Sequence, residues 1–202
     1  MSRGGGGLVN AGRPIPVNGG SPDGGKWDKL SAIALGGNTM ILGMSLQTFT
    51  LLHTVISLIG IATGLIVLRG LLNSNRMALW TGIFLLTTIL TSVTGFLFPA
   101  TAILPSHIVG LISLAVLAVA VAALYYYRLA GHWRWIYVVS AVLALYLNVF
   151  VGVVQTFLKV PVFHALAPTQ AEPPFAIAQG IVLLIFIGLG IVAAIRFRPA
   201  AA

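Results

Sequence analysis

Five long apolar stretches, separated by short connections, dominate the chain. They cover approximately residues 46–68, 78–98, 106–127, 135–158 and 175–195, and almost no charge interrupts them. A helix needs about 20 predominantly apolar residues to cross a hydrocarbon core of about 30 Å. The pattern therefore predicts an all-α, polytopic transmembrane bundle of five spans, in which the short connections make sequential neighbours antiparallel.

The segments around these spans predict less regular structure. Residues 1–29 are rich in Gly, Pro, Asn and Ser and contain no apolar run, so we expect a disordered tail. Residues 30–45 are mildly apolar but include two adjacent glycines, and we expect a short interfacial helix there. A sixth, poor transmembrane helix is the alternative. Residues 30–198 then form the transmembrane domain, and residues 199–202 form a short tail.

The composition of the chain fits a membrane environment. Of the 202 residues, 58% are hydrophobic and 7% are charged, whereas a soluble domain has about 25% charged residues. The net charge of +8 would suggest nucleic acid on a soluble protein. Here the basic residues flank apolar segments, so we expect a lipid bilayer and no nucleic acid as the partner. The chain has no cysteine, which excludes disulfides, thiolate metal sites and cysteine nucleophiles.

The basic residues also predict the orientation of the bundle. They concentrate in the first and third connections and after the fifth span, which lie at one end of an antiparallel bundle: Arg69, Arg76, Arg128, Arg134, Arg196 and Arg198. The positive-inside rule places this end in the cytoplasm and the N-terminus outside. Lys26 and Lys29 argue weakly against this orientation. We expect a bacterial inner membrane from the compact chain and its charge bias.

Aromatic residues cluster at the same predicted cytoplasmic end. They are Tyr125, Tyr126, Tyr127, Trp133, Trp135 and Tyr137. Tyrosine and tryptophan are enriched where a membrane meets water, because each combines an apolar ring with a polar group. We therefore expect all six side chains to form an interfacial belt.

Polar side chains at membrane depth are the candidate functional residues, because they are expensive there and usually face other helices or a cavity. At about 1.5 Å per residue, several lie about 21–25 Å from the basic end, in the outer half of the membrane. This polar layer and its outer boundary comprise His53, Thr91, Thr94, Asn148, Gln155 and Gln179. Gly60, Gly64 and Gly152 share its helix faces and predict close helix packing, with a Gly60–Gly64 dimer face as an alternative.

The histidines suggest a cofactor hypothesis. His53 lies within the first span and His107 begins the third, near the same end of the bundle, which makes them candidate haem or metal ligands. The competing interpretation is structural, with each polar group bonded to a neighbouring helix. No Asp or Glu lies inside a span, so a paired-carboxylate catalytic site is excluded and we name no catalytic residue. Glu172 lies in the fourth connection, where an exposed ion pair with Lys159 would be weak.

No motif of a characterised family is recognised, and three hypotheses follow. The first is a small non-catalytic accessory, assembly or interaction subunit whose polar layer stabilises its own bundle. Its partners would be other membrane-protein subunits or a second copy. The second is a haem- or metal-binding redox subunit with His53 and His107 as ligands. The third is a small transporter or channel lined by Thr, Asn and Gln side chains.

Overall fold

The computed structural model describes residues 40–99 and 105–198, so the tails predicted at 1–29 and 199–202 lie outside it. The described elements, in order, are β1 (Met40–Ile41), β2 (Met44–Ser45), α2 (Leu46–Leu72), α3 (Ala78–Gly95), α4 (Pro105–Val121), η1 (Ala122–Tyr126), α5 (Trp133–Lys159), α6 (Pro161–Leu166) and α7 (Pro173–Arg196). The helices α2, α3, α4 with η1, α5 and α7 are long and apolar enough to span a membrane. The prediction of an all-α protein with five spans is confirmed.

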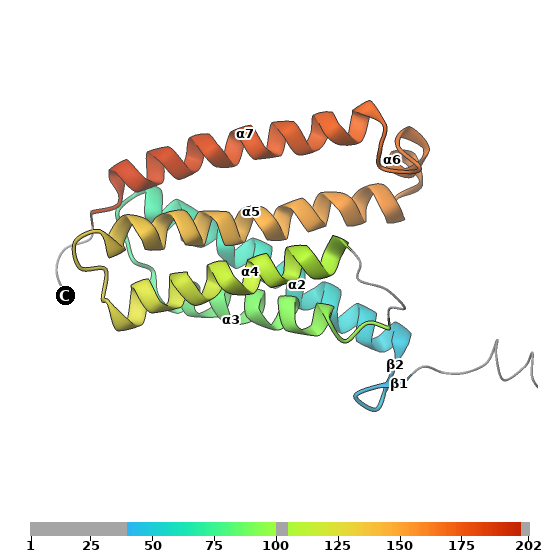
Figure 1. Cartoon of the computed structure of the whole chain (residues 1–202), viewed down its shortest axis with the longest axis horizontal. Coiled ribbons are helices and arrows are strands. Elements are labelled where there is room, and N and C mark those ends of the chain that lie inside the picture. The colour runs from blue at the N-terminus through green and yellow to red at the C-terminus, as the bar shows by residue number, and fades with distance from the viewer. Residues whose placement is uncertain (1–39, 100–104, 199–202) are drawn as a thin grey trace, which may run out of the picture. The chain divides into compact units, whose positions relative to one another are not determined.

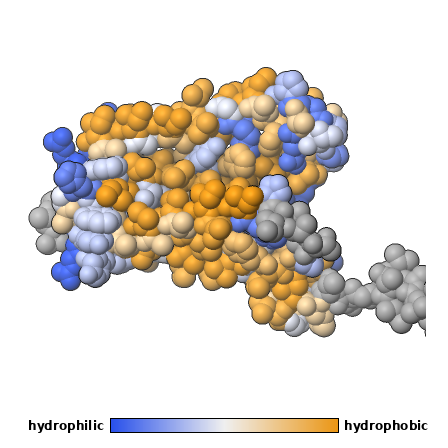
Figure 2. All heavy atoms as spheres, in the orientation of Figure 1, coloured by the Kyte–Doolittle hydropathy of each residue, from blue (hydrophilic) through white to orange (hydrophobic). Residues whose placement is uncertain are grey.

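The spanning helices lie roughly along a common direction (Figure 1). Each packs against its neighbour in the chain, and α5 contacts α2, α4 and α7. The α2–α3 connection, the η1–α5 connection and the C-terminal end of α7 lie at one end, which we call the basic end. Hydrophilic residues gather towards the two ends of the face in Figure 2, with apolar residues between them. This is the distribution expected of helices that cross a bilayer.

Local chemistry determines where several helices begin and end. The Ser45 hydroxyl accepts a hydrogen bond from the backbone N–H of Thr48 (3.2 Å) and caps the N-terminus of α2. Pro161 and Pro173 occupy the first turns of α6 and α7. Proline suits that position because the first backbone N–H groups of a helix have no partner within it.

The segment before α2 differs from the expectation of an interfacial helix over 30–45. Residues 30–39 lie outside the described residues, and Met40–Ser45 form a two-strand hairpin. Leu42 and Gly43 make its turn, with φ of 53° and 77°. Two consecutive residues with positive φ give the turn that fits the twist of a hairpin, and glycine adopts this conformation without strain. Met40–Ser45, the described part of this segment, is therefore not helical.

The third span ends in a widened turn. The Tyr127 N–H donates to the carbonyl of Ala122 (2.9 Å), five residues earlier, and defines η1. The chain then reverses through Arg128 and Leu129, whose φ values of 49° and 62° are left-handed. This reversal stacks the Tyr127 ring on Trp133, with centroids 3.6 Å apart and planes 3° apart. The stacked pair holds the η1–α5 connection together.

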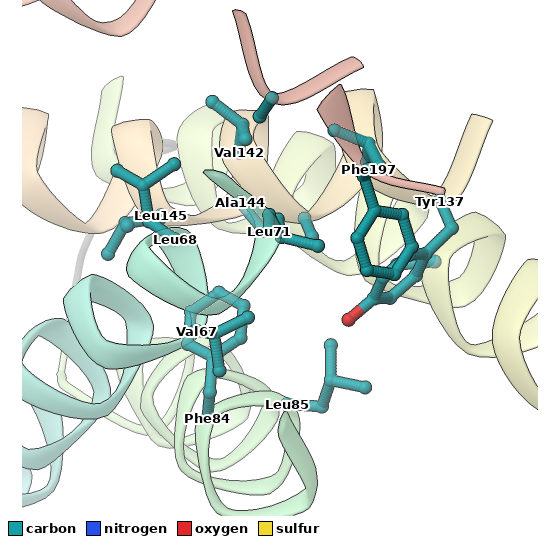
Figure 3. Packing of buried hydrophobic residues seen from close by; sticks show 14 of the residues in the cluster. Val67, Leu68, Leu71, Phe84, Leu85, Tyr137, Val142, Ala144, Leu145 and Phe197 are labelled. Carbon is teal, nitrogen blue, oxygen red and sulfur yellow. The ribbon is translucent and has the colours of Figure 1, made fainter. Parts of the chain in front are cut away.

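Tyr137 was expected in the aromatic belt, and this expectation was wrong. Its side chain is only 2% exposed. It lies on the inward face of α5 beside Phe197, which is fully buried (Figure 3). Their ring centroids are 6.1 Å apart. A tyrosine near a helix end is therefore not interfacial when its face of the helix points into the bundle.

The core joins all five spanning helices. Its larger buried members include Val67, Leu68, Leu71, Phe84, Leu85, Leu117, Tyr137, Leu145, Phe186 and Phe197 (Figure 3). The tightest contact in this region is at Gly64. A Cβ atom at this position would lie 2.4 Å from Cδ1 of Leu145 and 2.9 Å from Cε2 of Phe84. Only glycine therefore lets α2 approach α3 and α5 this closely.

Glu172 directly precedes α7, and its carboxylate is held by Thr169. Its carboxylate accepts hydrogen bonds from the backbone N–H (3.2 Å) and the hydroxyl (2.9 Å) of Thr169. Desolvation alone would raise the pKa of Glu172. The hydrogen bonds from Thr169 and neighbouring backbone N–H groups outweigh desolvation and hold the pKa below its usual value.

Substitution of Gly64 by leucine is expected to destabilise the bundle by about 1–3 kcal/mol, because the added side chain overpacks the buried contact with Phe84 and Leu145. Thermal unfolding in detergent measures this. Gly188→Leu is the matched control, since a Cβ atom at Gly188 would meet nothing within 4 Å. Equal melting temperatures for the two variants would show that α2 is not packed as described.

Replacing Thr169 by alanine should raise the pKa of Glu172 towards its ordinary value of 4.5. Glu172 is the single glutamate of the chain, so selective ¹³C labelling gives one carboxylate signal to titrate by NMR. Folding lowers the pKa of Glu172, so its ionised carboxylate stabilises the folded protein. This stabilisation is present above the unfolded pKa and is lost as pH falls through the folded pKa. Thr169→Ser keeps the hydroxyl and should titrate like the wild type. An unchanged pKa of Glu172 in Thr169→Ala would contradict the hydrogen bonds from Thr169 to its carboxylate.

Candidate functional site

His53 is bonded to the neighbouring helix α3. Its Nδ1 lies 2.8 Å from the hydroxyl oxygen of Thr94. The Thr94 hydroxyl donates its one hydrogen to the main chain of α3, with 2.7 Å to the carbonyl of Leu90. With its hydrogen on Leu90, the Thr94 oxygen accepts from His53, and this arrangement corresponds to a proton on Nδ1 of His53. Nε2 then carries the lone pair of the half-buried ring.

Asn148 connects the central helix α5 to α3. Its Nδ2 donates to the Thr88 hydroxyl at 3.0 Å. Gly60 of α2 lies beside this bond, since a Cβ atom there would be 3.3 Å from Nδ2 of Asn148 and 3.3 Å from the hydroxyl oxygen of Thr87. Three helices therefore meet at one polar contact. Gly60 and Gly64 are both buried inside the bundle, so the face that they share is not open to a second copy.

Gln179 connects α7 to α5. Its Nε2 donates to the backbone carbonyl of Phe150 at 3.1 Å. The side chain is 9% exposed. Its Oε1 is buried and has no hydrogen-bond partner among residues 40–99 and 105–198. One half of this amide therefore contributes to helix packing, while the other half is unsatisfied.

The remaining members of the predicted set are Thr91, Gly152 and Gln155. Thr91 is 3.4 Å from the hydroxyl of Ser57, which donates to the carbonyl of His53 at 2.7 Å. Gly152 packs against Ile61, with 3.5 Å from its Cβ position to Cδ1. Gln155 is exposed. The structure thus gives Thr91 and Gly152 contacts with α2 and leaves the Gln155 side chain at the surface.

His53 and His107 contact different aromatic rings. His53 meets Phe98 edge-on, with centroids 5.2 Å apart, whereas His107 stacks on Phe96 at 5.6 Å. In the described ranges, no group of three or more His, Cys, Asp or Glu side chains could hold a metal ion. The assignment of both histidines as cofactor ligands stays a prediction.

One interhelical pair was missed by the sequence reasoning. Ser92 of α3 and Ser113 of α4 are buried, with their hydroxyl oxygens 3.2 Å apart. Ser92 follows Thr88 by one helical turn, so both lie on the same face of α3. The available signal was the four-residue spacing of Thr88 and Ser92, and the pair extends the polar contacts of α3 to a second neighbour.

No protein-family model, no curated protein and no solved structure matches the chain. What the fold and composition establish is an integral membrane protein with five candidate spans, whose apolar helices require a lipid bilayer. Any more specific function must therefore be argued from the contacts of its own residues.

The Asn148–Thr88 bond should be measurable as a coupling between the two residues. In a double-mutant cycle of Asn148→Leu and Thr88→Val, we expect a coupling of about 0.6 kcal/mol, and no more than about 1.7, as for other hydrogen bonds between membrane helices. Thr54→Val is the control partner, because the Thr54 hydroxyl donates within its own helix to Thr50 (2.8 Å). The bond would be refuted if both cycles gave the same coupling.

Proposed function

We propose that the protein is a small non-catalytic accessory, assembly or interaction subunit of a bacterial inner membrane. One observation carries this proposal: deep polar side chains are used within the chain itself. His53 is bonded to Thr94, Asn148 to Thr88, and Gln179 to the main chain of α5. Groups that are bonded in this way stabilise the bundle and need no substrate to satisfy them.

The proposed orientation has the basic end in the cytoplasm and the N-terminus outside. Six arginines of the described residues lie in the connections and the C-terminal end that form the basic end. The positive-inside rule supports this assignment. The partners that we propose are other membrane-protein subunits or a second copy, which would meet the exposed apolar faces of the spans.

A haem- or metal-binding subunit is the second candidate, and one feature of His53 favours it. Histidine ligands commonly use one ring nitrogen for the metal and donate the other N–H to a fixed acceptor. His53 has this arrangement, because Thr94 holds Nδ1 and Nε2 is left with its lone pair. We rank it below the first candidate because His107 lies on a different aromatic ring.

A transporter or channel ranks third. It would need the Thr, Asn and Gln groups to line a polar pathway. The Thr88, Thr94 and Asn148 side chains instead bond to one another or to His53. A pathway between copies would still be consistent with the exposed Gln155.

The test is purification of the full chain from its own membrane in a mild detergent, followed by identification of copurifying proteins and by an absorption spectrum. We expect a membrane protein at fixed stoichiometry, or a homo-oligomer, and no Soret band. The variants His53→Ala, Asn148→Ala and Gln179→Ala should lower the melting temperature while the folded fraction keeps its partner.

Two results would contradict the proposal. A Soret band or bound metal that His53→Ala removes from a protein that stays folded would favour the second candidate. Liposome flux that Asn148→Ala abolishes without unfolding would favour the third. A matched control for both is Thr54→Ala, since Thr54 bonds only within α2 in the described structure.

A further inference from the structure

Three segments meet at the basic end around Phe197. The backbone N–H of Arg198 donates to the Ser74 hydroxyl in the α2–α3 connection (2.7 Å). The Arg134 guanidinium, in the first turn of α5, donates to the carbonyl of Phe197. The Phe197 ring is fully buried beside Tyr137. The residues after α7 are thus fixed between the α2–α3 connection and the start of α5.

Four arginines belong to these segments, and we call them the arginine junction: Arg76, Arg134, Arg196 and Arg198. Arg196 and Arg198 are exposed, while Arg76 and Arg134 are half-buried. Arg76 lies in the α2–α3 connection, two residues after Ser74, whose hydroxyl accepts the hydrogen bond from the Arg198 N–H. The junction therefore concentrates positive charge from three parts of the chain.

The described residues supply no carboxylate to neutralise this charge. Their one acidic side chain is Glu172, which precedes α7 at the opposite end of the bundle and bonds to Thr169. Like charges held together without a counter-ion repel one another, and an anion that binds there relieves the repulsion. Guanidinium groups suit phosphate in particular, because their planar donors match its oxygens in pairs.

The position of the junction indicates the source of that phosphate. It lies where the apolar parts of α2, α5 and α7 end. Exposed Tyr125, Tyr126 and Trp135 belong to the same end of the bundle, and such side chains mark the depth of lipid headgroups. A phosphate at this depth is most simply the headgroup of a phospholipid whose acyl chains lie along the spans.

We propose that the arginine junction is a binding site for the phosphodiester headgroup of an anionic phospholipid, with Arg76, Arg134 and Arg198 as its main contacts. The lipid would tie together the α2–α3 connection, the start of α5 and the residues that follow α7. Binding would therefore stabilise the basic end of the fold as well as attach it to the membrane surface.

The experiment compares the full-length protein in nanodiscs of phosphatidylcholine alone and with 20 mol% phosphatidylglycerol or cardiolipin, about one lipid in five, by thermal unfolding and native mass spectrometry. The anionic lipids should raise the melting temperature and remain bound. Each arginine near an anionic surface contributes about fivefold in affinity. The variant R76Q/R198Q should therefore bind the anionic lipids about 25-fold more weakly.

Matched controls separate a defined site from a diffuse charge effect. The variant R69Q/R128Q removes the same charge from the same end but lies outside the three segments, and it should bind like the wild type. If R76Q/R198Q does not fold in phosphatidylcholine, Arg198→Gln replaces it, because that side chain is exposed, and a loss of about fivefold in affinity is expected. The variant R76K/R198K, which keeps the charge, should restore most of the binding.

Three outcomes would overturn the proposal. Equal losses in the two glutamine double variants would indicate a diffuse surface effect. Equal retention of phosphatidylcholine would remove the requirement for an anionic headgroup. The same stabilisation by inorganic phosphate in phosphatidylcholine discs would assign the site to a free anion rather than to a lipid.

Discussion

The close approach of α2 to α3 and α5 at Gly60 and Gly64 is the contact on which the rest of the bundle depends. In a bilayer, apolar side chains gain little by leaving lipid for one another, so helix association relies on close packing and on polar bonds. Gly64 leaves room for Leu145 and Phe84, which would otherwise collide with its side chain. The glycines therefore determine how near the helices lie and which side chains can meet.

The polar layer follows from this close packing. Asn148 reaches Thr88 beside Gly60, where a larger residue on α2 would occupy the same space. An amide buried in lipid without a partner is costly, so its bond also fixes the rotation of α5 relative to α3. The same layer contains one unsatisfied atom, Oε1 of Gln179, which gives α7 a weaker polar contact with the bundle than α3 has.

Hydropathy alone predicted the five spans, because the thickness of the bilayer dictates the length of an apolar helix. Counting residues from the basic end predicted that His53, Thr94 and Asn148 lie at similar depth. It could not predict which of them touch, since the rotation of each helix about its axis depends on packing between helices. The burial of Phe197 could not be predicted either. A residue that lies between two arginines after the last span has the sequence pattern of an interfacial residue.

Local backbone conformation explains the other differences between expectation and structure. The hairpin at Met40–Ser45 depends on positive φ at Leu42 and Gly43, which hydropathy does not report. The η1 turn includes a hydrogen bond from Tyr127 to Ala122 over five residues. Such features leave the number of spans unchanged but determine where the connections direct the chain. They therefore affect the two ends of the bundle more than the membrane-embedded layer.

The absence of cysteine in the chain allows a direct test of whether α2 turns its glycine face towards α5 within one copy. Ile61 and Gly152 face each other, with 3.5 Å between Cδ1 of Ile61 and the Cβ position of Gly152. The double variant Ile61→Cys/Gly152→Cys should be bridged within one chain by a short bifunctional thiol reagent, detected by mass spectrometry, whereas Ile61→Cys/Gly188→Cys should not, because a Cβ atom at Gly188 meets nothing within 4 Å. Failure of the first pair to link, or links only between copies, would contradict the packing described.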